Sequence, residues 1–266
     1  MDKRLLGEPE NFYFSSDARS TKSSINQHYH GIYEIYFMKS GACNYFIDDR
    51  LYEVKSGDLI FIPDGIIHKT NYTGGTHSRL LINCSEDYIP ESIRQQVKNL
   101  PYLYRGGQVT RDAERIFSKI SEEYSRADTF SNDALKCYTG ELFFLFLRGA
   151  EQNDDREFQR SAAERAAKYV RENYCSQIGL SETADALSVS PEHLSRSFKR
   201  ETGFGFCEYL LLLRLQKAEY MLKNEPGRSV AEVAYACGFN DSNYFSDKFK
   251  RTYGIPPSHM KRQKEK

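Results

Sequence analysis

The C-terminal part of this 266-residue chain nearly repeats itself at an interval of about 50 residues. At an offset of 50, the first copy matches the second at Leu180, Thr183, Ala184, Leu187, Val189 and Ser190, against Val230, Val233, Ala234, Cys237, Phe239 and Asn240. At an offset of 51, the matches are Leu194, Phe198, Lys199, Arg200 and Gly203, against Phe245, Phe249, Lys250, Arg251 and Gly254. One extra residue therefore falls in the turn, and the chain must contain two similar supersecondary units.

Each copy has the parts of a helix-turn-helix. An alanine stands where two helices approach closely, a short turn follows, and the second helix carries an apolar stripe. In the first copy Ser190 is an N-cap and Pro191 takes the first helical position, where a missing N–H costs nothing. Asn240 or Asp241 can cap the second copy. The sequence predicts helix-turn-helix units at about 180–201 and 230–252.

The second helix of each copy has a polar face. Burial of Leu194 and Phe198 turns another face outward, with Glu192, Ser195, Arg196 and Lys199. Burial of Phe245 and Phe249 does the same for Ser242, Asn243, Ser246, Asp247, Lys250 and Arg251. Such a face is usually only a solvated surface. Two copies of it, in a segment (161–266) with 17 Lys and Arg against 13 Asp and Glu, favour a DNA-reading pair.

The same residues resemble a known family. Residues 161–260 are similar to the DNA-binding domain of the AraC/XylS regulators, through the runs 194–203, 237–246 and 254–258 and through Arg214, Leu215 and Ala218. The resemblance implies two helix-turn-helix subdomains joined by one long helix, 206–223. It also implies that the two recognition helices enter successive major-groove faces roughly 34 Å apart.

The resemblance assigns roles to the recognition helices. Glu192, Ser195 and Arg196 match base-facing positions of the first, and Ser242, Asn243 and Asp247 those of the second. Lys199 and Lys250 can reach phosphates. Asp247 departs from the family pattern, where a basic residue is common. Its carboxylate repels phosphate but can accept a hydrogen bond from a cytosine amino group.

The N-terminal half has a different pattern. Residues 11–88 contain short strands with turn signals, such as 34–38 and 44–47, and the apolar run 59–62 suits a strand buried on both faces. This pattern predicts an antiparallel barrel or sandwich over about 11–90. Helical spacing then predicts two helices within about 110–150. The polar segment 152–157 is the predicted linker, which gives domains 1–157 and 158–266.

Two motifs in this half resemble the cupin barrel. They contain His28, His30, Glu34 and Gly41, then Gly57, Pro63, Gly65 and His68, although Lys22 stands where the first motif has its leading glycine. The predicted fold class is therefore α+β, with an N-terminal cupin-like antiparallel β-barrel followed by helices and a C-terminal all-α tandem helix-turn-helix domain. In metal-binding cupins the residues that match His28, His30, Glu34 and His68 are ligands, and such a set could hold a divalent transition metal.

Because the barrel is joined to a predicted DNA-binding domain, we favour a sensory role for it. We expect a sequence-specific transcription regulator of promoter DNA, activator or repressor, with no catalytic residues and no required cofactor. Its small-molecule effector would bind in the barrel beside the four residues named above, and the resemblance suggests a sugar or related metabolite. It also suggests a homodimer through the helices at 110–150, and RNA polymerase is a further candidate partner.

Two alternatives stay open for the barrel. One is a metal-dependent cupin enzyme with a DNA-binding appendage, and the other is a metal-responsive regulator that uses the same four ligands. The sequence predicts no membrane-spanning helix. The longest apolar stretches, 142–147 and 209–213, are far shorter than the roughly 20 residues of a membrane span. The six scattered cysteines lack C-x-x-C spacing, as in a reducing compartment, and no signal core begins the chain. We expect a cytoplasmic protein without membrane partners.

Overall fold

The computed structural model describes residues 11–18, 31–72, 76–150 and 160–262. They form two compact units, one within residues 8–159 and the other from residue 160 onward. The domain boundary predicted near residue 157 lies outside the described residues, as do His28 and His30. None of the helices in the described ranges has the length and apolar character needed to cross a bilayer.

The N-terminal unit contains two antiparallel sheets. The five-stranded sheet has the order β1-β7-β2-β5-β8, and the three-stranded sheet the order β4-β3-β6. Their bounds are β1 Phe12–Ala18, β2 Tyr33–Ser40, β3 Ala42–Ile47, β4 Arg50–Lys55, β5 Leu59–Ile62, β6 His68–Asn71, β7 Ser78–Cys84 and β8 Leu103–Tyr104. Strand β2 lies between β5 and β7, so its residues sit at the centre of the larger sheet.

The residues of β2 alternate between two cores. Tyr33, Ile35 and Phe37 belong to the cluster that includes the following helices, whereas Tyr36 and Met38 belong to the cluster shared with the three-stranded sheet. Successive side chains of a pleated strand point to opposite faces of the sheet, so this alternation is expected. The predicted strand 59–62 is buried along its whole length and divides in the same way between the two clusters. The face that carries Tyr36 and Met38 is therefore the interior of the double-sheet barrel.

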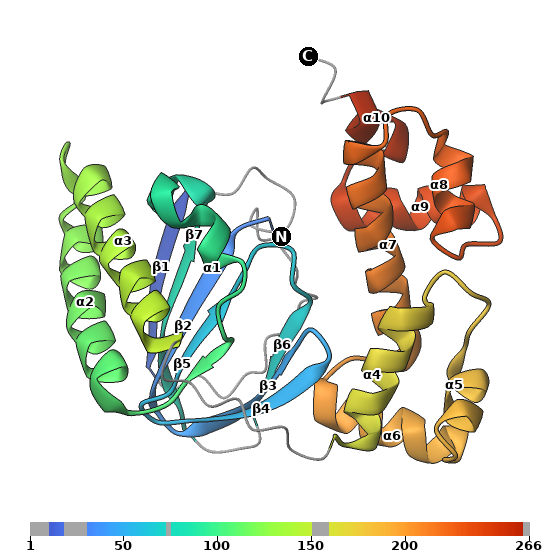
Figure 1. Ribbon diagram of the computed structural model, residues 1–266, viewed down its shortest axis with the longest axis horizontal. Helices are drawn as coiled ribbons and strands as arrows, with labels where there is room; N and C mark the ends of the chain where they lie inside the picture. The colour runs from blue at the N-terminus through green and yellow to red at the C-terminus, as the bar shows by residue number, and fades with distance from the viewer. Residues whose placement is uncertain (1–10, 19–30, 73–75, 151–159, 263–266) are drawn as a thin grey trace. The chain divides into compact units, whose positions relative to one another are not determined.

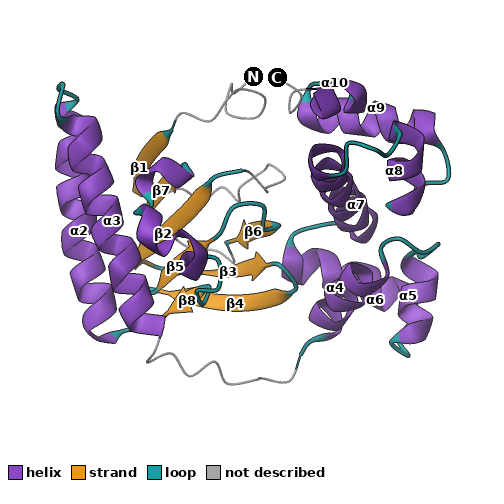
Figure 2. Cartoon of the chain, turned by 45° about the horizontal axis from the view of Figure 1, so that its top comes forward, coloured by secondary structure: helices purple, strands orange, loops and turns teal. Residues whose placement is uncertain are grey.

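Helices cover the other face of the larger sheet. After the short turns η2 Glu86–Tyr88, η3 Glu91–Ile93 and α1 Arg94–Val97, the chain forms the long helices α2 Gly107–Arg126 and α3 Ser131–Ala150. These two lie side by side along the sheet (Figures 1 and 2). Their apolar faces bury Ile116, Phe117, Ile120, Leu142, Phe143 and Phe146 against it. Two helices were predicted within about 110–150, and α2 begins slightly earlier, at Gly107.

The C-terminal unit is all helical. Its helices are α4 Ala162–Asn173, α5 Leu180–Ala186, α6 Pro191–Thr202, α7 Phe206–Asn224, α8 Val230–Ala236, α9 Ser242–Tyr253 and α10 Pro257–Arg262. Helix α7 runs from the cluster of α4, α5 and α6 to the cluster of α8, α9 and α10 (Figure 1). It buries residues for both clusters, which explains its apolar composition. The predicted fold class is confirmed.

The two copies of the sequence repeat also form equivalent turns. Both α5 and α8 end in the same pattern, in which Val189 N–H donates to the Ala184 carbonyl (3.0 Å) and Phe239 N–H to the Ala234 carbonyl (3.1 Å). The two alanines are fully buried. The second helix of each pair then begins at a side-chain cap. Ser190 accepts from His193 N–H at 3.2 Å, and Asp241 from Tyr244 N–H at 2.7 Å. Asp241, not Asn240, is thus the N-cap of α9.

Candidate nucleic-acid interface and effector site

Helix α6 presents a polar face at helical spacing. Leu194 and Phe198 are fully buried, whereas Glu192, Ser195, Arg196 and Lys199 are exposed. These four positions follow the i, i+3, i+4, i+7 pattern, so they share one face. The Arg196 Nε donates to the Glu192 carbonyl at 3.3 Å, one turn earlier. The structure places the four predicted DNA-contacting residues of this helix together.

Helix α9 presents the corresponding face. Phe245 and Phe249 are fully buried, Asn243, Asp247 and Lys250 are exposed, and Ser242 is half-buried. At an offset of 51, Asp247 occupies the place that Arg196 has in α6. Its carboxylate lies 3.1 Å from Arg251 Nε, one turn further along the helix. The acidic group is therefore placed beside a guanidinium, where it can orient that cation as well as contact a base.

The two predicted phosphate-contacting lysines differ in their surroundings. Lys199 Nζ donates to the Gly203 carbonyl at 2.9 Å and lies 3.9 Å from Glu208, so it interacts with the C-terminal end of α6. Both helices end in the same backbone bond, from Gly203 N–H to the Lys199 carbonyl (3.1 Å) and from Gly254 N–H to the Lys250 carbonyl (2.8 Å), and Lys250 is exposed on α9. Lys199 must leave its carbonyl to reach a phosphate, whereas Lys250 is not so held in the described part of the chain.

Inside the barrel, Glu34 is the centre of a polar cluster. Strand register brings Asn83 of β7 opposite Glu34, and its amide donates to Glu34 Oε2 at 3.3 Å. The Tyr45 hydroxyl, from β3 of the other sheet, donates to Glu34 Oε1. Burial raises the pKa of Tyr45 well above its ordinary value, and the Glu34 carboxylate raises it further. Tyr45 therefore stays a proton donor, and the two sheets are linked through a buried carboxylate.

The structure brings together two of the four predicted metal ligands. His68 Nε2 lies 3.7 Å from Glu34 Oε2, and His68 Nδ1 lies 2.7 Å from the Ile66 carbonyl. A carbonyl only accepts, so Nδ1 carries a proton and Nε2 faces the carboxylate. Within residues 11–18, 31–72, 76–150 and 160–262, no three His, Cys, Asp or Glu side chains are arranged to bind a metal ion. The four-ligand site stays a prediction, because His28 and His30 lie outside those ranges.

A second polar group lies two residues further along β2. The Tyr36 hydroxyl lies 3.3 Å from the Tyr72 hydroxyl and 3.9 Å from Cys43 Sγ, and Arg79 stands over the Tyr36 ring at 5.7 Å. Tyr72 in turn stacks on His77, with ring centroids 3.7 Å apart. Burial raises the pKa of the Cys43 thiol to about 11, so it stays protonated. The interior thus offers hydroxyls, a guanidinium and aromatic faces in one row.

Most of this cluster was not singled out in the sequence. No motif described above contains Tyr36, Tyr45, Tyr72, Arg79 or Asn83. Tyr36 could have been identified from its spacing, because it lies two residues after Glu34 on the same strand and so shares its face. The others depend on the register between strands distant in sequence.

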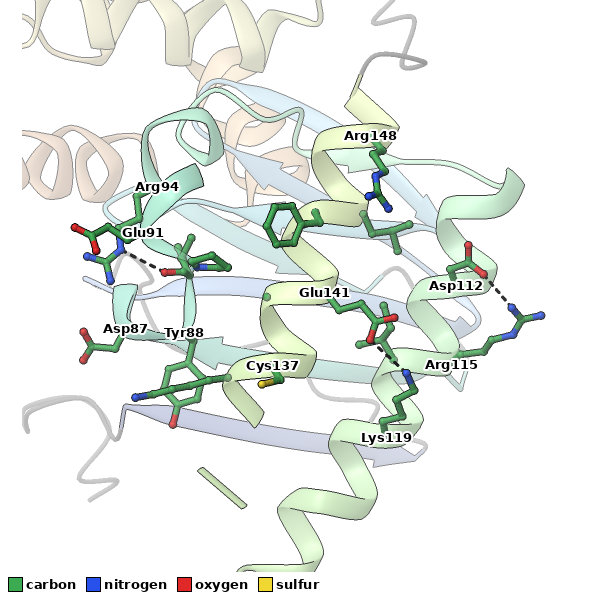
Figure 3. Close-up of a pocket in the computed structure, with 17 residues that line it drawn as sticks. Asp87, Tyr88, Glu91, Arg94, Asp112, Arg115, Lys119, Cys137, Glu141 and Arg148 are labelled. Atoms are coloured by element: carbon green, nitrogen blue, oxygen red, sulfur yellow. Dashed lines mark hydrogen bonds and ion pairs between the residues drawn. The ribbon is translucent and has the colours of Figure 1, made fainter. Parts of the chain in front are cut away.

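A groove marks the outer surface of the N-terminal unit (Figure 3). It has a volume of about 1010 Å³ and lies between α3, the first half of α2 and the segment 87–94. Its charged lining residues are of both signs: Arg94, Arg115, Lys119, Lys136 and Arg148 with Asp87, Glu91, Asp112 and Glu141. Phe144 in the same lining is 41% exposed.

Together, the paired helix-turn-helix units and the double-sheet barrel define a two-domain DNA-binding transcription regulator. Two family models match the chain: an AraC-like ligand binding domain over residues 14–136, and a helix-turn-helix domain over residues 183–263. The chain belongs to the AraC/XylS family of transcription regulators, with a cupin-like ligand-binding domain at its N-terminal side. It is a regulator and not an enzyme, which sets aside the catalytic alternative.

Individual relatives are similar to the chain over different lengths. The HTH-type transcriptional activator RhaS of Escherichia coli K12 is 23% identical over 260 residues, which cover 94% of this chain and 92% of the relative. The C-terminal domain of the response regulator yesN from Fusobacterium nucleatum is 36% identical over 38% of this chain and 97% of that one, with a TM-score of 0.36. ToxT from Vibrio cholerae, solved with an unsaturated fatty acid bound, is 15% identical over 97% of both chains, with a TM-score of 0.40.

Proposed function

We propose that a hydroxyl-bearing metabolite, such as a sugar or a related compound, binds in the barrel at the polar cluster around Glu34 and thereby controls promoter binding. The observation that carries this proposal is the meeting of Glu34, Tyr45 and Asn83 in the barrel interior. Burial of a carboxylate, a phenol and an amide costs free energy of desolvation, which apolar residues filling the same space would not cost. Placed in a ligand domain, they match the few convergent polar groups that fix a small molecule in an aromatic pocket.

Hydroxyl groups suit this lining because they both donate and accept. Glu34 accepts, the Tyr45 oxygen can accept while its proton is donated to Glu34, the Asn83 amide donates, and the Tyr36 and Tyr72 hydroxyls can do either. The tyrosine rings add flat apolar surface for C–H groups. For regulation to follow, the effector must bind one DNA-binding state of the protein more tightly than the other.

On the DNA side, we assign base reading and phosphate contact to different residues. Glu192, Ser195 and Arg196 of α6, and Ser242, Asn243 and Asp247 of α9, read base edges. Lys199 and Lys250 contact phosphates and set affinity without sequence preference. The support is the matched exposure of the two faces, which places equivalent positions of α6 and α9 outward.

We further propose that two chains associate through the α2–α3 groove. In a twofold-symmetric dimer the same patch meets itself, so a patch with both charge signs can be its own complement. The groove has five basic and four acidic residues in its lining, with the exposed Phe144 among them. A second copy would bury Phe144 and exchange the charges. Contact with RNA polymerase stays a prediction with no particular surface assigned.

The metal-responsive alternative uses the same barrel residues. Glu34 and His68 already lie together, and His28 and His30 would complete the set. Elemental analysis of the purified protein, compared with His68→Ala, separates this alternative from the metabolite sensor. A stoichiometric metal that His68→Ala loses would favour it.

A ligand panel tests the effector proposal. Thermal unfolding of the full-length protein is followed with sugars, sugar acids and polyols, because a ligand of the native state raises the melting temperature. We expect at least one hydroxyl-bearing compound to stabilise the protein, and Glu34→Gln and Tyr45→Phe to abolish the shift. Glu53→Gln is the matched control, since Glu53 is exposed on β4 beside Lys55. Stabilisation only by apolar acids, or a shift that survives both barrel variants, would contradict the proposal.

A further inference from the structure

The two helix-turn-helix units are joined by more than helix α7. The loop 174–177, which connects α4 to α5 in the first unit, meets the turn 238–240, which connects α8 to α9 in the second. Arg214, in the middle of α7, completes this contact. We call the loop 174–177, Arg214, Gly238 and Asn240 the latch.

Arg214 holds the loop side of the latch. Its Nε donates to the Tyr174 carbonyl at 2.8 Å and its Nη2 to the Ser176 carbonyl at 2.9 Å. Tyr174 is the C-cap of α4, where carbonyls lack partners within the helix. Burial lowers the pKa of Arg214 from its ordinary value, yet the group stays charged at neutral pH. These are charge-assisted bonds in a half-buried place, among the stronger hydrogen bonds of a protein.

Gly238 shows that the approach is close. Its Cα has no room for a side chain, because a Cβ would lie 2.5 Å from the Tyr174 carbonyl oxygen and 3.0 Å from Arg214 Nε. The left-handed turn alone does not demand glycine. Ser188, at the equivalent position of the first unit, has φ 56°, against 83° at Gly238. The glycine is required in the second turn because Tyr174 and Arg214 of the latch lie against its Cα, where the first turn has a serine.

Asn240 supplies the remaining contact. Its amide Nδ2 donates to Gln177 Oε1 at 2.8 Å, and Gln177 Nε2 donates back to Asn240 Oδ1. Since Ser190 and Asp241 are the equivalent N-caps, Asn240 is the extra residue that separates the two copies of the repeat. The one insertion in the second turn is thus a residue that contacts the first unit. It also directly precedes the N-cap of the recognition helix α9.

We propose that the latch sets the register between the two recognition helices and so determines which half-site spacing the regulator accepts. Helix α7 fixes the separation of the two units, and a second link beside it restricts rotation of one unit relative to the other. On DNA, a shift by one base pair both translates and rotates the second half-site, so a locked pair tolerates one spacing. The latch residues are positioning residues. This inference rests on the proposed reading of DNA by both α6 and α9.

The test measures spacing preference with the full-length protein. Its selected DNA site is prepared at the optimal half-site spacing and with one base pair inserted or removed, together with single half-sites. We expect Gln177→Ala and Asn240→Ala each to reduce the preference for the optimal spacing by about tenfold, the scale of the two exposed hydrogen bonds that either variant removes. Affinity for single half-sites should not change. Ser188→Gly is the matched control, because it alters the equivalent turn outside the latch.

The outcomes separate the two claims. If the wild type binds a single half-site as tightly as the pair, the two-helix reading of DNA fails. If the wild type requires one spacing and both amide variants keep the same spacing profile, the latch is overturned. Arg214→Met, which keeps the aliphatic part of the side chain, should broaden the profile further. The two exposed amide variants decide the matter if Arg214→Met does not fold.

Discussion

On the exposed side of α9, the guanidinium Nε of Arg251 lies 3.1 Å from a carboxylate oxygen of Asp247. Asp247 stands where α6 has Arg196, so the second recognition helix has an acidic residue at a position that the first gives to a cation. An exposed i, i+4 pair contributes little to stability, typically about 0.3–0.5 kcal/mol. The pair therefore contributes little to folding, and we propose that Asp247 acts in DNA contact.

We expect Asp247→Ala to change base preference at one position of the second half-site. A carboxylate that accepts from a cytosine amino group, or that orients Arg251 toward a base, discriminates by about 1–3 kcal/mol. Binding to randomised half-sites checks this. If Asp247→Ala instead raises affinity for every sequence alike, the carboxylate only repels phosphate and reads nothing.

Arg196→Ala should relax base preference at one position of the first half-site, at a cost of about 1–3 kcal/mol for the preferred base. Lys223→Ala is the control, because Lys223 is a cation on α7, outside both recognition helices, and pairs with Glu219 at 2.6 Å. Competition binding with single-base variants of the site distinguishes the two. An equal loss on all sequences for Arg196→Ala would remove its base-reading role.

Lys250→Ala should weaken binding to all sequences and lower the slope of log affinity against log salt by about 0.9, as for one phosphate contact. Lys199→Ala should do the same and should also lower the thermal stability slightly, because Lys199 bonds the Gly203 carbonyl at 2.9 Å. Salt titrations and melting curves measure both effects. A loss confined to one sequence would contradict the phosphate assignment.

Phe144→Asp should shift the protein from dimer to monomer in sedimentation experiments, since it replaces the exposed apolar residue of the proposed self-complementary groove with a charge. Phe130→Asp is the matched control: Phe130 is 77% exposed and is not part of the groove lining. We expect it to leave the oligomeric state unchanged. A monomeric wild type, or a Phe144→Asp dimer, would rule out this surface as the interface.

Much of the fold could be predicted because its signals are local. The helix-turn-helix units follow from residues within one stretch of chain, such as the Ser190-Pro191 start of α6, and from the fact that the pattern occurs twice. The long helix predicted over 206–223 is observed as α7, which ends at Asn224. The barrel strands follow from alternation and turn residues in the same way.

The parts that were missed depend on contacts between distant segments. Asn83 meets Glu34 through the register of β2 and β7, and Tyr45 reaches Glu34 from the other sheet. No spacing in the sequence gives either contact. The repeat showed that the second turn holds one extra residue. The contact of Asn240 with Gln177, 63 residues away, becomes visible only when both units are packed on α7.

The central claim is that α6 and α9 read DNA as a pair under control of the barrel. Selection from a randomised DNA pool with the full-length protein, with and without an effector found in the ligand panel, tests it most directly. We expect one enriched bipartite motif, with half-sites about one helical turn or 10–10.5 base pairs apart, whose enrichment changes with effector. Enrichment of a single short motif, or of none under either condition, would contradict it.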